Sequence, residues 1–248
     1  MTSRRRAVVT GAASGIGRAT MFELARTGHN VVGLDINDAG LQAAVQDAME
    51  LGGHHLGLCV DVSDEAAVQA AFDRAVDFLG GLDALATCAG IAETSPFMSL
   101  TVESFRRVND VNVIGSFLCL REAARRMAPG GRLCTVSSVA GLRGGGLLGT
   151  AAYAASKGAV LALTKNAARS LAPLGLSVNC VAPGPTLTPM IADAWQDPAL
   201  RERVESLTVL KRTADPHELA CSIVFLLSPA AANITGATLV NDGGLSMF

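Results

Sequence analysis

Aromatic residues are scarce in this chain of 248 residues: they make up 4% of it, with one Trp and one Tyr. The chain also lacks a run of about 18 consecutive apolar residues, the length that a membrane-spanning helix needs. The apolar stretch behind the basic N-terminus, Ala7–Val9, is much shorter than the roughly 7–15 apolar residues of a secretion signal. We therefore expect no membrane partner and a cytoplasmic location.

Charge of one sign is not in excess either. Lys and Arg number 20 and Asp and Glu 22, a formal net charge of −2 without long runs of one sign. Because nucleic acids are bound through basic patches, no nucleic-acid partner is expected. The six cysteines form no CxxC pair, and the four histidines suggest no ligand cluster by their spacing. This pattern predicts free thiols in a reducing compartment and no metal site.

Small and apolar residues are abundant by contrast. Half of the chain is apolar and 26 residues are Gly, which favours close helix–sheet packing. Short apolar runs alternate with helical stretches, and this alternation predicts an α/β fold in one domain, 1–248, with a parallel sheet covered on both faces. After a first strand near Arg6, strands are expected at Asn30–Leu34, His55–Val60, Ala84–Cys88, Arg132–Ser137, Leu176–Val181 and Thr238–Val240, and long helices at Thr101–Ala128 and Ala152–Leu174.

Three connections depart from this regular alternation: Ile91–Leu100, the glycine-rich Gly141–Gly149, and Pro183–Pro216. Ligands of parallel sheets bind beyond the carboxyl ends of the strands, where such connections begin. The third one is too long for a simple connector. We interpret its residues 186–215 as a substrate loop.

A glycine-rich turn, Thr10–Gly17, joins the first expected strand to the first helix. Glycines there let the backbone approach a pyrophosphate, and the helix N-terminus offers free N–H groups. The second strand ends at Asp35, whose carboxylate could accept both hydroxyls of an adenosine ribose and would repel a 2′-phosphate. Since neither Ser14 nor Ile36 is basic, the sequence favours NAD over NADP.

Asp61 and Val62 follow the third expected strand. The carboxylate of Asp61 could lie near the adenine amino group, with the Val62 amide beside the ring. An acid in this place is also typical of a helix cap. Spacing alone leaves both interpretations open.

Tyr153, the only tyrosine, lies four residues before Lys157, so the two side chains share one face of the expected helix. A phenol titrates near pH 10 in water, and a nearby cation stabilises its phenolate form. The strand before this helix ends at Ser137-Ser138, which brings a hydroxyl close to the phenol. We interpret Tyr153 and Lys157 as a proton-transfer pair.

These motifs together resemble the short-chain dehydrogenase/reductase family, and the resemblance runs from Arg6 to Gly244. The motifs that carry it are TGxxxGxG at Thr10–Gly17, the acid Asp35, Asp61-Val62, Asn112, Ser138, the YxxxK pair Tyr153 and Lys157, Pro183-Gly184 and Asp242–Gly244. The family implies a Rossmann-type doubly wound sheet of seven parallel strands in the order 3-2-1-4-5-6-7. It also implies a homotetramer built through the two long helices and the last strand.

The resemblance implies hydride transfer between a nicotinamide and a secondary alcohol or ketone. Tyr153 would act as general acid/base and Ser138 would hydrogen-bond the reacting oxygen. Lys157 would bind the nicotinamide ribose and lower the pKa of Tyr153, while Asn112, which fits the family register better than Asn109, would hold a water. Cofactor contacts are implied at Gly11, Ser14, Gly15, Ile16, Gly17, Asp35, Asp61, Val62, Ala89, Gly90, Tyr153, Lys157, Pro183, Gly184, Thr186 and Thr188.

The chain departs from the family pattern at two places. Cys88 stands where relatives usually have the second Asn of an Asn-Asn-Ala-Gly motif, and a thiol cannot replace the paired donor and acceptor of an amide. Ser138 also lies farther from Tyr153 than in many relatives, which predicts a longer loop at Leu142–Gly149. Ser137 is the alternative hydroxyl.

The expected substrate pocket is lined by Ile91–Phe97, Ala140–Thr150 and Thr186–Trp195, which are mostly small and apolar. A compact apolar or cyclic alcohol fits this lining. Arg143 is the one mobile cation, and it either contacts an anionic group of the substrate or is solvated.

Two other functions are considered. A 3-oxoacyl-[acyl-carrier-protein] reductase is disfavoured by Asp35, because such enzymes usually prefer NADPH. An NAD-binding sensor or structural protein without catalysis would not need Asn112, Ser138, Tyr153 and Lys157 together.

Overall fold

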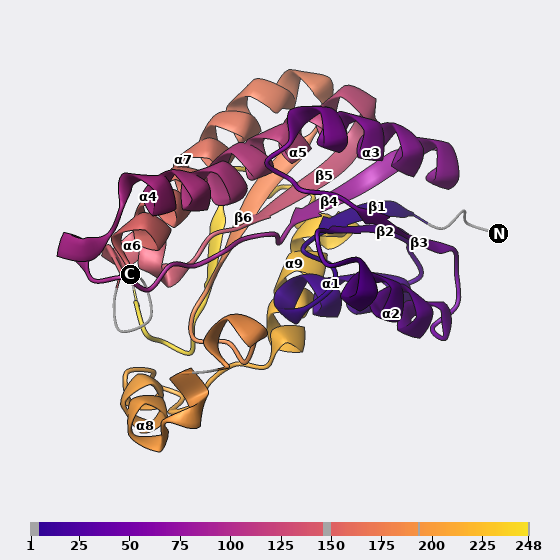
Figure 1. The fold of residues 1–248 in the computed structure, drawn as a ribbon. Coiled ribbons are helices and arrows are strands. Elements are labelled where there is room, and N and C mark those ends of the chain that lie inside the picture. Colours follow the sequence, from indigo (N-terminus) through magenta and orange to yellow (C-terminus); the bar gives the residue numbers. More distant parts are fainter. Residues whose placement is uncertain (1–4, 146–149, 193, 248) are drawn as a thin grey trace.

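Seven parallel strands form one sheet in the order β3-β2-β1-β4-β5-β6-β7 within the residues described, which are 5–145, 150–192 and 194–247 of this computed structural model (Figure 1). The arrangement confirms the predicted Rossmann-type doubly wound sheet. The strands are β1 (Arg6–Thr10), β2 (Asn30–Asp35), β3 (His55–Cys59), β4 (Leu82–Thr87), β5 (Met127–Val136), β6 (Ser177–Pro183) and β7 (Thr238–Asn241).

Helices cover both faces of the sheet. One face carries α1 (Gly15–Arg26), α2 (Asp38–Met49) and α9 (Pro216–Leu227); the other carries α3 (Glu65–Leu79), α4 (Val102–Asn109), α5 (Gly115–Arg126) and α7 (Ala151–Leu171) (Figure 1). Alternate side chains of a strand point to opposite faces. Val9 of β1 accordingly packs in the core with Met21 of α1, whereas Val8 packs in the core with Phe72 of α3.

Local sequence signals explain where several helices begin and end. Asp64 caps α3, since its carboxylate accepts a hydrogen bond from the Ala67 N–H, and Gly80 ends this helix with φ of 72°. Asp215 and Glu218 form a capping box at the start of α9. Both devices satisfy backbone groups that have no partner inside the helix.

The helix expected at Thr101–Ala128 is interrupted and shorter. A π-helical turn, Asp110–Ile114, separates α4 from α5, and β5 begins at Met127 instead of Arg132. The early start has a physical reason, because Met127 pairs with Leu82 of β4 across an irregular register. The helix expected to reach Leu174 is α-helical to Leu171 and ends in a 3-10 turn that contains a proline.

The two long connections contain short helices. α6 (Val139–Arg143) follows β5 and opens the glycine-rich loop, of which 146–149 lie outside the described residues. Two 3-10 turns and α8 (Pro198–Ser206) occupy much of the predicted substrate loop, where residue 193 is not described. α8 lies beyond the end of β6, away from the sheet (Figure 1).

The arginines of α5 are held by ion pairs within the chain. Glu122, only 1% exposed, binds the guanidinium groups of Arg121, Arg125 and Arg126. Burial raises the pKa of Glu122, but hydrogen bonds from Arg126 and Arg121 outweigh that effect and hold it below its usual value. None of the helices among the described residues is long and apolar enough to cross a membrane.

Candidate active site

A cavity of about 960 Å³ opens beyond the carboxyl ends of the central strands. Its wall brings together residues from β1 to the segment after β6, which are far apart in the sequence. Among them are Ser138 and all the predicted cofactor-contacting residues: Gly11, Ser14, Gly15, Ile16, Gly17, Asp35, Asp61, Val62, Ala89, Gly90, Tyr153, Lys157, Pro183, Gly184, Thr186 and Thr188. Of the predicted site residues, Asn112 alone does not line this cavity.

The glycine turn can accept only glycine at two of its positions. A Cβ on Gly17 would lie 2.0 Å from the Gly11 carbonyl oxygen, and a Cβ on Gly11, which has φ of 69°, would lie 2.8 Å from the Ala89 nitrogen. Ser14 makes no side-chain cap of α1, so it leaves the first N–H groups of the helix to other acceptors. A close backbone and free donors at a helix N-terminus fit a pyrophosphate.

Asp35 is fixed at the end of β2 by two backbone donors. One carboxylate oxygen accepts from the Ala13 N–H and the other from the Asn37 N–H, each at 2.9 Å. Each oxygen keeps a further lone pair for a ligand. Ile36 beside it is 63% exposed and brings no cation to this end of the cavity.

Asp61 does not cap α3, since Asp64 does so. Its carboxylate accepts hydrogen bonds from both the N–H and the hydroxyl of Ser63. These bonds, and the charge of Arg107, lower the pKa of Asp61 against the effect of burial. Asp61 is therefore not a helix cap: its carboxylate stabilises a turn, and the residue also lines the cavity, as a cofactor contact requires.

Tyr153 and Lys157 both point into the cavity from α7. Burial raises the pKa of Tyr153, and a hydrogen bond with Ser138 opposes this shift only in part. Burial also lowers the pKa of Lys157 to about 8. In the protein without a cofactor, the expected lowering of the Tyr153 pKa by Lys157 is not found. The Lys157 ammonium lies 5.7 Å from the centre of the tyrosine ring and donates to the Val136 carbonyl oxygen instead.

The two serines at the end of β5 have distinct partners. The Ser137 hydroxyl donates to the Lys157 carbonyl oxygen at 2.7 Å, so it ties β5 to α7. The Ser138 hydroxyl accepts from the Ala140 N–H at 3.1 Å, and it lies near enough to Tyr153 to lower the pKa of that phenol. Both serines line the cavity, but the hydroxyl of Ser137 is already used by the Lys157 carbonyl oxygen.

Asn112 lies behind the cavity in the π-helical turn. Its side-chain amide accepts from the Ile91 N–H at 2.8 Å and donates to the Ile91 carbonyl oxygen and to the Ser156 hydroxyl. Ser156 in turn donates to the Tyr153 carbonyl oxygen. The side chain therefore joins the loop after β4 to the helix that carries the tyrosine.

The departure at Cys88 leaves a partly buried thiol at the cavity wall. Burial raises the pKa of Cys88 to about 12, and its sulfur lies 4.0 Å from the Thr20 hydroxyl. The backbone here is held by Thr10 instead, whose hydroxyl accepts from the Ala89 N–H at 3.0 Å. This role of Thr10 was not predicted from the sequence.

Apolar side chains line the part of the cavity beyond Tyr153. Ile91, Ala92 and Ile191 come from the predicted walls, with Arg143 at the end of α6. Several other lining residues were not predicted: Arg107, Val111, Val204, Leu207 and Leu245. The apolar spacing of Val204 in α8 and Leu207 just after it is a sequence signal that could have indicated two of them.

The sheet and this cavity define a dinucleotide-binding α/β protein with a tyrosine–lysine pair at its site. The family described as Enoyl-(Acyl carrier protein) reductase matches residues 11–246. A cis-4-hydroxycyclohexanecarboxylate dehydrogenase of Sinomonas cyclohexanicum is 40% identical over 245 residues, which are 98% of this chain and 96% of that protein. A 3-oxoacyl-[acyl-carrier-protein] reductase of a Synechocystis strain is 35% identical and covers 98% of this chain and 97% of its own length.

Among solved structures, a short chain dehydrogenase from Burkholderia cenocepacia in complex with NADP superposes with a TM-score of 0.90. It is 32% identical, and the match covers 99% of both chains. The chain belongs to the short-chain dehydrogenase/reductase family of oxidoreductases.

Proposed function

We propose that this protein is an NAD(H)-dependent oxidoreductase that interconverts a small secondary alcohol and its ketone, with Tyr153 as general acid/base. The observation that carries the proposal is that Tyr153, Ser138 and Lys157 line the wall of one cavity together with the glycine turn and Asp35. A nicotinamide cofactor supplies or accepts the hydride when it is bound. The chain's own residues position the reactants and move the proton.

In the reducing direction Tyr153 donates its phenolic proton to the ketone oxygen, while Ser138 hydrogen-bonds the same oxygen. In the oxidising direction the phenolate takes the hydroxyl proton. Because burial raises the pKa of Tyr153, its protonated form prevails at neutral pH. We therefore expect alcohol oxidation to accelerate as the pH rises into the alkaline range.

Lys157 supports this site as a buried donor. One of its three N–H groups is used by the Val136 carbonyl oxygen, and two remain for the hydroxyls of a nicotinamide ribose. Thr188 follows Pro183-Gly184 at the same cavity and would hold the carboxamide, and Thr186 would add a backbone contact. Asp35 would hold the adenosine ribose, and its negative charge supports NAD as the cofactor.

A compact apolar or cyclic alcohol is the proposed substrate class, because the wall beyond Tyr153 is formed largely by apolar side chains. A relative at 40% identity is named for a cyclic hydroxycarboxylate. Arg143 would contact the carboxylate of such a substrate, since no ion pair or hydrogen bond of its side chain occurs among the described residues and it lines the cavity.

We further propose that the protein is a cytoplasmic homotetramer. The exposed apolar side chains of Val102, Phe105 and Phe117 on α4 and α5 support assembly through these helices. The cysteines are free thiols, which supports a reducing compartment.

The test follows nicotinamide absorbance with a panel of cyclic, linear and acidic secondary alcohols and ketones, each with NAD(H) and NADP(H). Tyr153→Phe should lower kcat by about 10²–10⁴-fold, the usual contribution of a general acid/base, while NADH binding measured by fluorescence is retained. Ser138→Ala should lower kcat strongly, and the matched control Ser137→Ala should do so much less.

Three outcomes would contradict parts of the proposal. Full activity of Tyr153→Phe would remove the tyrosine from the mechanism. A preference for NADPH, together with turnover of 3-oxoacyl substrates, would favour an acyl-carrier-protein reductase. NADH binding without turnover of any member of the panel would favour a sensor or structural role.

A further inference from the structure

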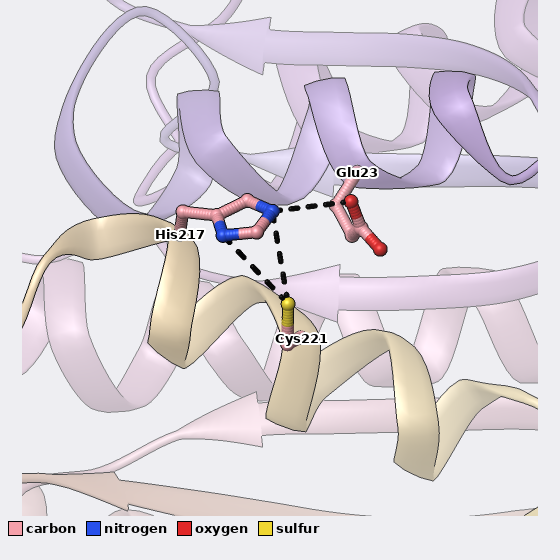
Figure 2. Close-up of side chains that lie close together, drawn as sticks. All are labelled: Glu23, His217 and Cys221. Atoms are coloured by element: carbon pink, nitrogen blue, oxygen red, sulfur yellow. Dashed lines mark hydrogen bonds and ion pairs between the residues drawn. The ribbon is translucent and has the colours of Figure 1, made fainter.

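A second group of reactive side chains lies where α1 packs on α9 (Figure 2). Glu23 projects from α1, and His217 and Cys221 project from the first turns of α9 (Figure 2). The three side chains point toward one another (Figure 2). None of them lines the cavity that contains Tyr153.

The distances in this cluster suit a small cation. The Nε2 atom of His217 lies 3.3 Å from a carboxylate oxygen of Glu23 and 3.7 Å from the sulfur of Cys221. One ligand atom from each residue lies within 4.8 Å of the other two. Tetrahedral Zn²⁺, with bonds of about 2.0–2.3 Å, separates a nitrogen from an oxygen by about 3.4 Å and from a sulfur by about 3.6 Å.

The chemistry of the three donors is selective. Imidazole and thiolate together favour Zn²⁺ over Mg²⁺ or Ca²⁺, which prefer sets of oxygen ligands. His217 and Cys221 are one helical turn apart, so one face of α9 presents both. The side chain of Glu23 is only 6% exposed, and it forms the opposite side of the cluster.

Arg26 is the main competitor of a cation at this place. Its guanidinium donates to both carboxylate oxygens of Glu23. A carboxylate has about four acceptor sites, so two remain for other partners, and one of them already faces His217. Both His217 and Cys221 are exposed, which leaves a path for a cation and room for a water as fourth ligand.

We infer that Glu23, His217 and Cys221 form a surface binding site for a Zn²⁺-like divalent cation, which joins α1 to α9 outside the cofactor cavity. Coordination by sulfur releases the thiol proton of Cys221 to solvent. The bound cation would stabilise the packing of the two helices, because it binds the folded chain and not the unfolded one.

The test uses Co²⁺ alone as the probe, added to the full chain. Coordination by a thiolate should produce a sulfur-to-cobalt charge-transfer absorption band, and Zn²⁺ added afterwards should abolish it. Cys221→Ser should remove the band, and His217→Ala should weaken cobalt binding by at least about tenfold. Cys59→Ser is the matched control, since Cys59 is also an exposed free thiol but lies in β3, outside this cluster.

Thermal unfolding gives a second readout that does not depend on turnover. Zn²⁺ should raise the unfolding midpoint of the wild-type chain and of Cys59→Ser, but not that of Cys221→Ser or His217→Ala. Because His217 is exposed, its replacement should leave the chain folded. The inference is wrong if the band survives in Cys221→Ser, if it disappears in Cys59→Ser, or if wild-type chain shows neither band nor shift.

Discussion

Cofactor choice gives the sharpest test of the site, because it depends on one carboxylate. The Ala13 and Asn37 N–H groups hold both oxygens of Asp35, so this carboxylate cannot rotate away from a 2′-phosphate. Two unit charges 4 Å apart repel by about 4 kcal/mol at an effective dielectric constant of 20. Asp35 is partly exposed, and solvent and salt reduce this to about 2 kcal/mol. A repulsion of that size lowers kcat/KM for NADP(H) about 30-fold relative to NAD(H).

We expect wild-type protein to prefer NAD(H) over NADP(H) by at least that factor in initial-rate measurements. Asp35→Ser should remove most of the preference, and Asp35→Ser with Ile36→Arg should reverse it. Asp38→Ser is the control, because Asp38 is a nearby acid that does not line the cavity. A wild-type preference for NADP(H), or an unchanged ratio in Asp35→Ser, would refute this electrostatic reasoning.

Three further predictions follow from particular contacts. Arg143→Ala should raise the KM of a cyclic substrate with a carboxylate about tenfold and leave that of a neutral analogue unchanged; equal KM values for the anionic substrate would dismiss the contact. Glu122→Gln should lower the free energy of unfolding by about 2 kcal/mol in urea titrations at neutral pH. Folding lowers the pKa of Glu122, so its stabilising contribution is present above the unfolded pKa near 4.5 and is lost as the pH falls through the folded pKa. If Glu122→Gln lost the same free energy of unfolding at pH 3 as at pH 7, this prediction would be wrong. Gly90→Ala would place a Cβ 3.1 Å from Asn112 Oδ1 and 3.3 Å from Lys157 Nζ. We expect a clear loss of kcat with only a small change in the thermal unfolding midpoint. An unaltered kcat would show that the Lys157 ammonium can move away from the added methyl group.

Much of the fold could be predicted because its signals are local. Apolar runs at strand spacing, the glycine turn and the acid that ends β2 each require only a few neighbouring residues. The carboxyl ends of parallel strands then meet at one edge of the sheet, so Asp35, Ser138 and the segment after Pro183 had to lie together. The cavity wall confirms that placement, although the roles of these residues stay predictions.

The parts that could not be predicted depend on contacts between distant segments. The early start of β5 involves pairing of Met127 with Leu82, and Asn112 in the π turn hydrogen-bonds Ile91 of the loop after β4. The spacing of His217 and Cys221 was a local signal that the sequence analysis missed. Glu23, 194 residues before His217, could not be added to them without the packing of α1 on α9.

Two hydrogen bonds at the end of β5 hold Lys157 in place. Lys157 is the donor in one of them and the acceptor in the other. Lys157 donates from its ammonium to the Val136 carbonyl oxygen, and its own carbonyl oxygen accepts from the Ser137 hydroxyl. The lysine is thus fixed at both its backbone and its side chain, and Ser138 is left to contact the phenol of Tyr153. Since one strand end holds the ammonium and supplies that hydroxyl, a shift of β5 against α7 would misplace both groups together. The two adjacent serines thus have different partners, Ser137 the Lys157 carbonyl oxygen and Ser138 the Ala140 N–H.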